Sequence, residues 1–136
     1  MRRASWPVTI IAVLLAALAN AGLIVSIVVD LKGLTPIAIS DFWLIPGIVV
    51  LGALLGLTIG DTARGAVALL VVAVLGASLS GLAIAAPGAR VEGVRVTLID
   101  RGTTYGLLAL MLIALFGLSG IVIAWLIESV VGRSDE

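Results

Sequence analysis

Residues 105–127 read YGLLALMLIALFGLSGIVIAWLI, an uninterrupted run without one charged side chain. An α-helix rises about 1.5 Å per residue, so about 20 apolar residues cross the roughly 30 Å hydrocarbon core of a bilayer. Backbone N–H and C=O groups in lipid must be hydrogen-bonded within the segment, which favours a helix over an open strand. This stretch therefore predicts a transmembrane helix.

Three further stretches have the same character, at residues 8–29, 42–60 and 65–86, and all eight Lys/Arg and all eight Asp/Glu lie outside the four stretches. The chain is 62% hydrophobic and 12% charged, whereas an ordinary soluble domain is roughly 25% charged. A soluble fold of 136 residues could not bury so large an apolar fraction. We predict an all-α membrane protein, a four-transmembrane-helix bundle of up-down-up-down topology with short loops. Residues 1–136 would form a single integral membrane domain.

The first stretch also has features of a cleaved signal peptide. Arg2 and Arg3 form a basic start, and Ala19-Asn20-Ala21 has the small-residue character of a cleavage site. The apolar run continues through residues 23–29, however, and reaches spanning length. We therefore expect a retained first helix.

The connections between the stretches predict turns of different kinds. Asp61-Thr-Ala-Arg64 is a tight turn, in which Asp61 or Thr62 can cap the third helix. So short a link predicts that the second and third spans pack side by side and antiparallel. Residues 89–103 form the longest polar connection. Apolar residues alternate within this connection, which suits a short hairpin or an extended strip on the membrane surface, and a solvated loop is the other interpretation.

Four aromatic side chains occupy predicted span ends, where Trp and Tyr anchor a helix at the membrane surface: Trp6, Trp43, Tyr105 and Trp125. In a four-span topology the first and last of these mark one side of the membrane, and the other two mark the opposite side. Both termini then lie on the same side. The basic residues divide evenly between the two sides, but Arg2 and Arg3 precede the first helix, which usually dominates orientation. We expect a multi-pass protein of a cell membrane or virion envelope, with cytoplasmic or internal termini.

The second span contains two overlapping GxxxG units on one helical face, and the third span carries small residues at the same spacing. In lipid, where no hydrophobic force drives helices together, small residues let backbones approach closely. This glycine zipper predicts close helix contact, either within one chain or between copies of it. The predicted helix-packing residues are Gly52, Gly56, Gly60, Ala73, Ala77 and Gly81.

Asn20 is the one strongly polar side chain near the middle of a span. An amide in lipid seeks a hydrogen-bond partner, at an average gain of roughly 0.6 kcal/mol. It would either join two helices through Ser78, Ser80 or Ser119, or contact a substrate or ion inside the bundle. The hydroxyl groups of the spans are expected to bond a carbonyl one turn back in their own helix.

The residue inventory narrows the function further. The chain has no Cys and no His, which removes disulfides, thiol chemistry and the usual zinc and haem sites. Proton-coupled carriers place an ionisable residue within the membrane, and the small multidrug resistance exporters depend on a Glu in the first helix, where this chain offers Asn20. A net charge of zero gives no basic surface for nucleic acid. We predict no enzyme activity, no metal and no cofactor.

The layout of the whole chain combines four spans, a basic Arg2-Arg3 start, an acidic Asp135-Glu136 end and a lack of Cys. In this layout it resembles the small four-span membrane proteins of haloarchaeal pleomorphic virus envelopes. The resemblance implies a protein that lies within a lipid envelope and has little mass outside it. We expect a structural or assembly role in a lipid envelope or membrane complex, with the bilayer, a second copy or another membrane protein as partner. The alternative is a small oligomeric channel or transporter.

Overall fold

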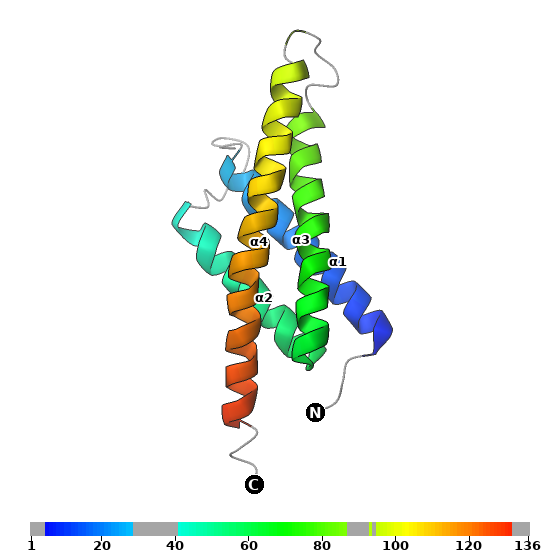
Figure 1. Cartoon of the computed structure of the whole chain (residues 1–136), viewed down its shortest axis with the longest axis vertical. Coiled ribbons are helices and arrows are strands. Elements are labelled where there is room, and N and C mark those ends of the chain that lie inside the picture. Colours follow the sequence, from blue (N-terminus) through cyan, green and yellow to red (C-terminus); the bar gives the residue numbers. More distant parts are fainter. Residues whose placement is uncertain (1–4, 29–40, 87–92, 94, 132–136) are drawn as a thin grey trace.

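The computed structural model of the protein is almost entirely helical over the residues that it describes, which are 5–28, 41–86, 93 and 95–131. Four α-helices follow one another along the chain: α1 (Trp6–Val28), α2 (Leu44–Ile59), α3 (Thr62–Ala85) and α4 (Arg95–Val131). A short 3₁₀ helix, Asp41–Trp43, leads into α2. The long helices α3 and α4 run side by side in opposite directions, and α1 and α2 cross them obliquely (Figure 1). The all-α class expected from the sequence is confirmed.

Three of these helices are long and apolar enough to cross a membrane. They are α1, α3 and α4, of 23, 24 and 37 residues. Helix α2 has only 16 residues, a length of about 24 Å against a hydrocarbon core of roughly 30 Å. Length alone therefore identifies three spanning helices among the described residues.

The beginning of α4 differs from both interpretations of residues 89–103. Residues 95–103 are the first turns of α4 and form neither a loop nor an extended strip, while residues 89–92 and 94 lie outside the described residues. These turns pack closely on α3, because a Cβ atom on Gly102 would stand only 2.7 Å from the carbonyl oxygen of Gly81. Tertiary packing of this kind overrides a short alternating pattern, which is a weak local signal.

Gly60 and Asp61 reverse the chain between α2 and α3. Gly60 has a left-handed backbone, with φ of 64°, and its N–H donates to the carbonyl oxygen of Gly56 at 3.0 Å. Only glycine adopts this conformation without a steric penalty, which ends α2 here. The Asp61 carboxylate accepts hydrogen bonds from the backbone N–H groups of Ala63 and Arg64 at 3.0 and 3.3 Å. The predicted capping role of Asp61 is confirmed.

The expectation that the second and third spans pack side by side along their length is wrong. Helix α2 packs mainly against α4 and has little contact with α3. A contact between α2 and α3 is found close to the turn, where a Cβ atom on Gly65 would lie 3.9 Å from Gly56 Cα. A two-residue turn holds only one end of each helix together, and from there α2 runs obliquely across α4 (Figure 1). Helix α1 packs against α3 and α2.

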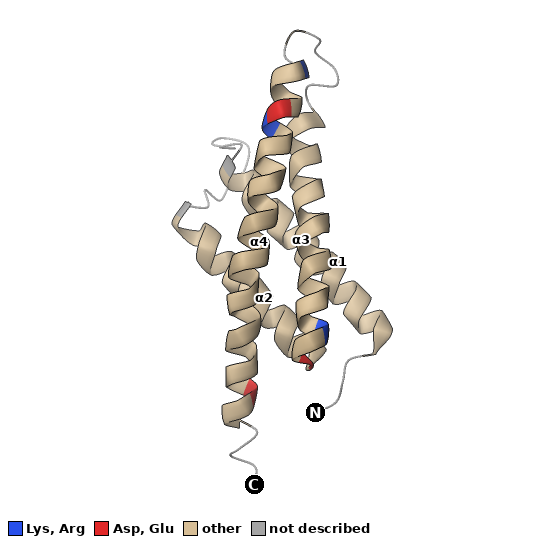
Figure 2. Cartoon of the chain, in the orientation of Figure 1, with Lys and Arg blue, Asp and Glu red and all other residues tan. Residues whose placement is uncertain are grey.

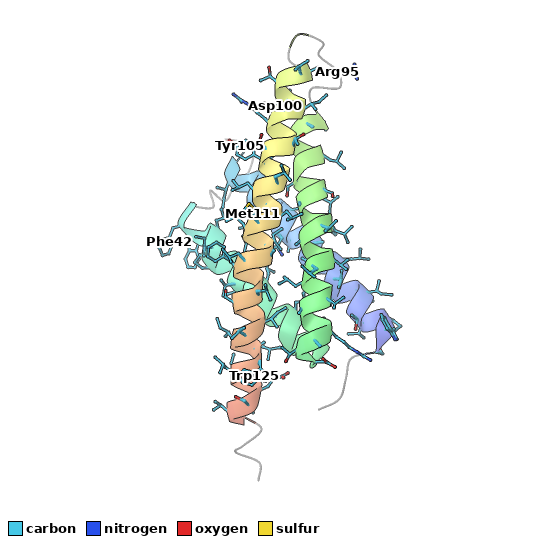
Figure 3. All side chains as sticks on the ribbon, viewed as in Figure 1. Phe42, Arg95, Asp100, Tyr105, Met111 and Trp125 are labelled. Carbon is cyan, nitrogen blue, oxygen red and sulfur yellow. The ribbon has the colours of Figure 1, made fainter. Side chains whose placement is uncertain are left out.

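The buried core lies where the helices cross, and it includes Ala17 of α1, Leu69 and Val72 of α3, and Ile113 of α4. Large apolar side chains also cover the outer faces of all four helices, and Phe42 extends outward at the start of the α2 segment (Figure 3). The charged residues that are coloured in Figure 2 gather at the two ends of the α3–α4 pair. Apolar outer faces with charges confined to the ends suit a lipid environment.

The cap of α3 can be tested by two substitutions at one position. Asp61→Ala removes the acceptor for two backbone N–H groups and should cost about 1 kcal/mol of stability. Asp61→Asn keeps an acceptor while it removes the charge, so it should retain most of the stability. Thermal unfolding of the purified protein in detergent measures both changes. Equal melting temperatures for the two variants would contradict a capping role.

Candidate functional site

A close backbone approach joins α2 and α4 at their crossing. Gly52 lies directly against the backbone of Gly117, so that a Cβ atom on Gly52 would overlap the Gly117 carbonyl oxygen. Gly120 of α4 lies equally close to the backbone of α2. One turn further along α2, a Cβ atom on Gly56 would stand 2.9 Å from the Cβ of Ala124. Contacts between backbones are a main source of helix association in lipid.

A second close approach joins α3 and α4 toward the other end of α4. A Cβ atom on Gly81 would stand 2.8 Å from the carbonyl oxygen of Gly102. A Cβ atom on Gly106 would stand 3.3 Å from the carbonyl oxygen of Ala77. Helix α4 therefore meets α3 through glycines near its start and α2 through glycines beyond its middle, and it is the central helix of the arrangement.

The predicted packing residues fall into three groups in the structure. Gly52 and Gly56 contact α4, whereas the sequence pattern pointed to the third span. On α3, Ala77 and Gly81 face α4 and Ala73 is buried in the core. Gly60 is the C-cap of α2.

Sequence reasoning missed the four glycines of α4 that complete the crossings: Gly102, Gly106, Gly117 and Gly120. The spacing of the first two is itself a GxxxG unit and could have been recognised as a packing signal. The unit was missed because residues 89–103 were interpreted as a polar connection, which placed Gly102 in the connection and Gly106 in the following span.

Asn20 is buried on α1 where α1 meets α3, and it is 2% exposed. Its Nδ2 donates to the carbonyl oxygen of Ala16 in its own helix, at 2.8 Å, and its Oδ1 has no hydrogen-bond partner among the described residues. The expected bond to a serine of another span is not formed. The three candidate hydroxyls donate to carbonyls of their own helices, as expected for hydroxyls in spans: Ser78, Ser80 and Ser119.

Four helix ends meet at one end of the bundle. The guanidinium carbon of Arg64, at the start of α3, lies 6.0 Å from the ring centroid of Trp6, at the start of α1. Asp61 lies at the turn that ends α2, and its Oδ2 is 4.0 Å from Arg64 Nε. Asp61 also lines a small cavity of about 10 Å³ together with Trp125 and Glu128 of α4. The starts of α1 and α3 therefore lie beside the ends of α2 and α4 (Figure 1).

The predicted aromatic anchors are mostly exposed. Trp6 and Trp125 belong to the end just described, and Trp43 is also exposed, beside the start of α2. The ring of Trp43 packs edge to face on Phe42, with 5.7 Å between the ring centroids. Tyr105 is half-buried on α4. Exposed indole rings at helix ends are suited to contact with lipid headgroups.

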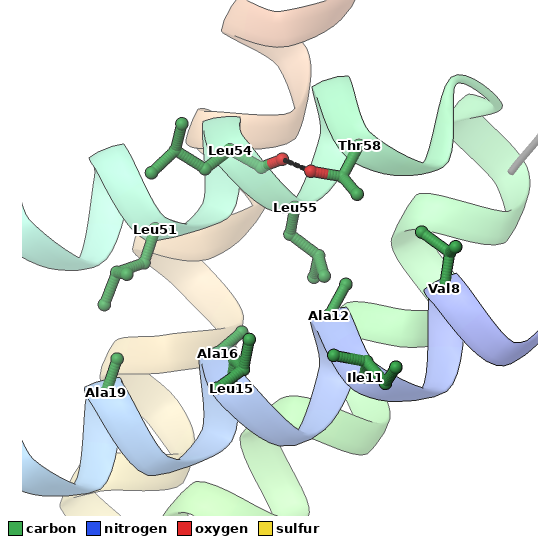
Figure 4. Close-up of a pocket in the computed structure, with 10 residues that line it drawn as sticks. All are labelled: Val8, Ile11, Ala12, Leu15, Ala16, Ala19, Leu51, Leu54, Leu55 and Thr58. Atoms are coloured by element: carbon green, nitrogen blue, oxygen red, sulfur yellow. Dashed lines mark hydrogen bonds between the residues drawn. The ribbon is translucent and has the colours of Figure 1, made fainter.

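In the part of the chain that the structure describes, apolar grooves run between three pairs of neighbouring helices. The groove between α1 and α2 measures about 530 Å³, and its lining includes the Thr58 hydroxyl, which donates to the carbonyl oxygen of Leu54 (Figure 4). The groove between α3 and α4 measures about 660 Å³ and follows Gly81 and Gly102. The groove between α1 and α3 measures about 530 Å³ and has Arg64 at one end. Among the described residues no group of three or more acidic side chains is placed to hold a metal ion.

The close crossing of α2 and α4 predicts that Gly52 does not tolerate a larger side chain. Gly52→Ala should lower stability by roughly 1–3 kcal/mol, because the new methyl group collides with the rigid backbone of α4. Gly22→Ala is the matched control, since a Cβ atom there meets nothing within 4 Å. That change should leave stability the same or raise it by up to about 1 kcal/mol through helix propensity. Thermal unfolding in one detergent compares the two variants, and equal melting temperatures would refute a close crossing at Gly52.

No protein-family model matches the chain, and neither a curated protein nor a solved structure matches it. The proposed function therefore rests on the crossings, the helix ends and the grooves.

Proposed function

We propose that the chain is a four-span integral membrane protein with a structural or assembly role, in a lipid envelope or as a small subunit of a membrane complex. The observation that carries the proposal is the contact between Trp6 and Arg64. Helix α1 starts at the end of the bundle from which α3 also starts. The chain must therefore return to this end between α1 and α3, and α2 is the helix that returns. If only α1, α3 and α4 crossed the membrane and α2 lay on one surface, the starts of α1 and α3 would be on opposite sides of the membrane.

The length of the α2 segment supports the same topology. The 16 residues of α2 and the three residues of the preceding 3₁₀ helix together rise about 30 Å, at 1.5 and 2.0 Å per residue. This is the thickness of a hydrocarbon core, and local thinning of the bilayer accommodates a span that runs obliquely. Trp43 lies at the start of the segment, where an interfacial anchor is expected.

The structural role rests on how the chain uses its residues. The described charges are confined to helix ends, the outer faces are apolar, and the closest contacts are between backbones. Little of the described chain extends beyond the helices. This combination fits a protein whose role is to pack within lipid. The small four-span proteins of virus envelopes, which the layout resembles, are of this kind.

The alternative of an oligomeric channel or transporter has one observation in its favour, the buried Asn20 with its unpaired Oδ1. Asn20 packs against α3, however, where a Cβ atom on Gly76 would lie in van der Waals contact with Asn20 Cβ, at 3.8 Å. It lines none of the three grooves described above. Its position therefore favours packing over a path for solutes.

Single cysteines test the topology directly, because the natural chain has none. Ser5→Cys and Ser129→Cys lie beside the start of α1 and near the end of α4, and Gly93→Cys lies just before α4. We expect the first two to react together with a membrane-impermeant maleimide, from the cytoplasmic or internal side, and the third to react from the opposite side. In a three-span topology Ser5→Cys and Gly93→Cys would react together instead, and the proposal would be wrong.

Reconstitution separates the structural role from transport. The purified protein in sealed liposomes should cause no more leakage of ions or small solutes than empty liposomes do. The physical reason is that a path for ions needs polar groups along the span, whereas the three grooves are lined almost wholly by apolar side chains. Saturable flux that disappears in an Asn20→Ala variant would establish the transporter alternative.

A further inference from the structure

We propose that the groove between α1 and α3 binds an anionic phospholipid, with the headgroup phosphate at Arg64 and an acyl chain along the apolar part of the groove. This inference rests on the proposed four-span arrangement, in which the groove faces the bilayer. It adds to that arrangement a defined ligand class and a defined site.

The groove has the dimensions of one bilayer leaflet. On α3 its lining extends from Ala63 to Leu75 and on α1 from Trp6 to Leu14. Twelve residue steps along α3 correspond to about 18 Å, and one leaflet contributes about 15 Å of hydrocarbon. The volume of about 530 Å³ is open along its side, so that a lipid can enter from the bilayer. Aliphatic residues line the part that points toward the middle of the membrane, including Val13, Val67 and Val71.

The polar end of the groove carries a cation in a defined position. Arg64 is the one charged residue among the described residues of the lining, and its side chain is 47% exposed. Its guanidinium stands over the ring of Trp6, which restrains it at the mouth of the groove. Guanidinium groups bind phosphate through paired N–H donors, and they remain charged at any physiological pH.

The neighbouring carboxylate does not occupy this position. Asp61 is not part of the groove lining, and its Oδ1 accepts hydrogen bonds from the backbone N–H groups at the start of α3. Its Oδ2 stands 4.0 Å from Arg64 Nε, at the outer limit of an ion pair. By contrast, the described linings of the α1–α2 and α3–α4 grooves contain no charged residue. Charge complementarity therefore selects the α1–α3 groove for an anionic lipid.

The test compares two lipids that differ only in headgroup. The full chain in mild detergent is mixed with phosphatidylglycerol or phosphatidylcholine of identical acyl chains, and retained lipid is counted by native mass spectrometry. One arginine near a membrane surface corresponds to about a fivefold preference for the anionic lipid. Arg64→Gln should remove this preference. Arg101→Gln is the matched control, because it removes the same charge from an exposed position on α4 outside the three grooves, and it should keep the preference.

A second variant tests the groove without touching the charge. Val67 is 62% exposed on the groove wall, so Val67→Trp fills the groove without disturbing the core and should lower retention of phosphatidylglycerol. Inorganic phosphate, at the concentration used for the lipid, should not displace it. The proposal is overturned if the natural chain shows no headgroup preference, if Arg101→Gln loses as much preference as Arg64→Gln, or if free phosphate competes fully. The cysteine labelling pattern judges the four-span topology independently of these results.

Discussion

Direct contact between glycine backbones along α4 is the interaction on which the rest of the structure depends. In water the burial of apolar side chains would hold such helices together, but in lipid the outer and inner faces are equally apolar and this force is lost. What remains is close packing, and glycines make it possible, as where Gly52 meets Gly117 and where Gly81 meets Gly102. Helix α4 is long enough to make both contacts, one near its start and one beyond its middle.

The oblique paths of α1 and α2 across the α3–α4 pair create grooves on the surface of the molecule. Helices that cross at an angle touch at one place and diverge on either side of it, so grooves open between them. The grooves beside α1 are of this kind, and both are lined mainly by aliphatic side chains. In a bilayer such grooves are filled by acyl chains. The groove that ends at Arg64 is the one for which we propose a preference among lipid headgroups.

Polar side chains contribute little to the association of the helices. The hydroxyls of Ser78, Ser80 and Thr58 donate to their own helices, and so does the amide of Asn20. Each bond satisfies a donor without joining two elements. The arrangement of the helices is therefore governed by shape and by the two helix ends that the Gly60–Asp61 turn holds together.

The sequence by itself determined the local properties of this protein. Uncharged stretches of spanning length predict the helices and the lipid solvent, and the residue pattern at Asp61 predicts the cap of α3, because hydropathy and capping depend on residues close together in the chain. Only the tertiary structure decided that Gly52 and Gly56 meet α4 rather than α3, that residues 95–103 continue α4, and that Asn20 forms no bond to another helix. These outcomes depend on the angle at which distant segments cross. A pattern of small residues predicts that another helix can pack closely on that face. Which helix packs there is determined by the geometry of the whole bundle.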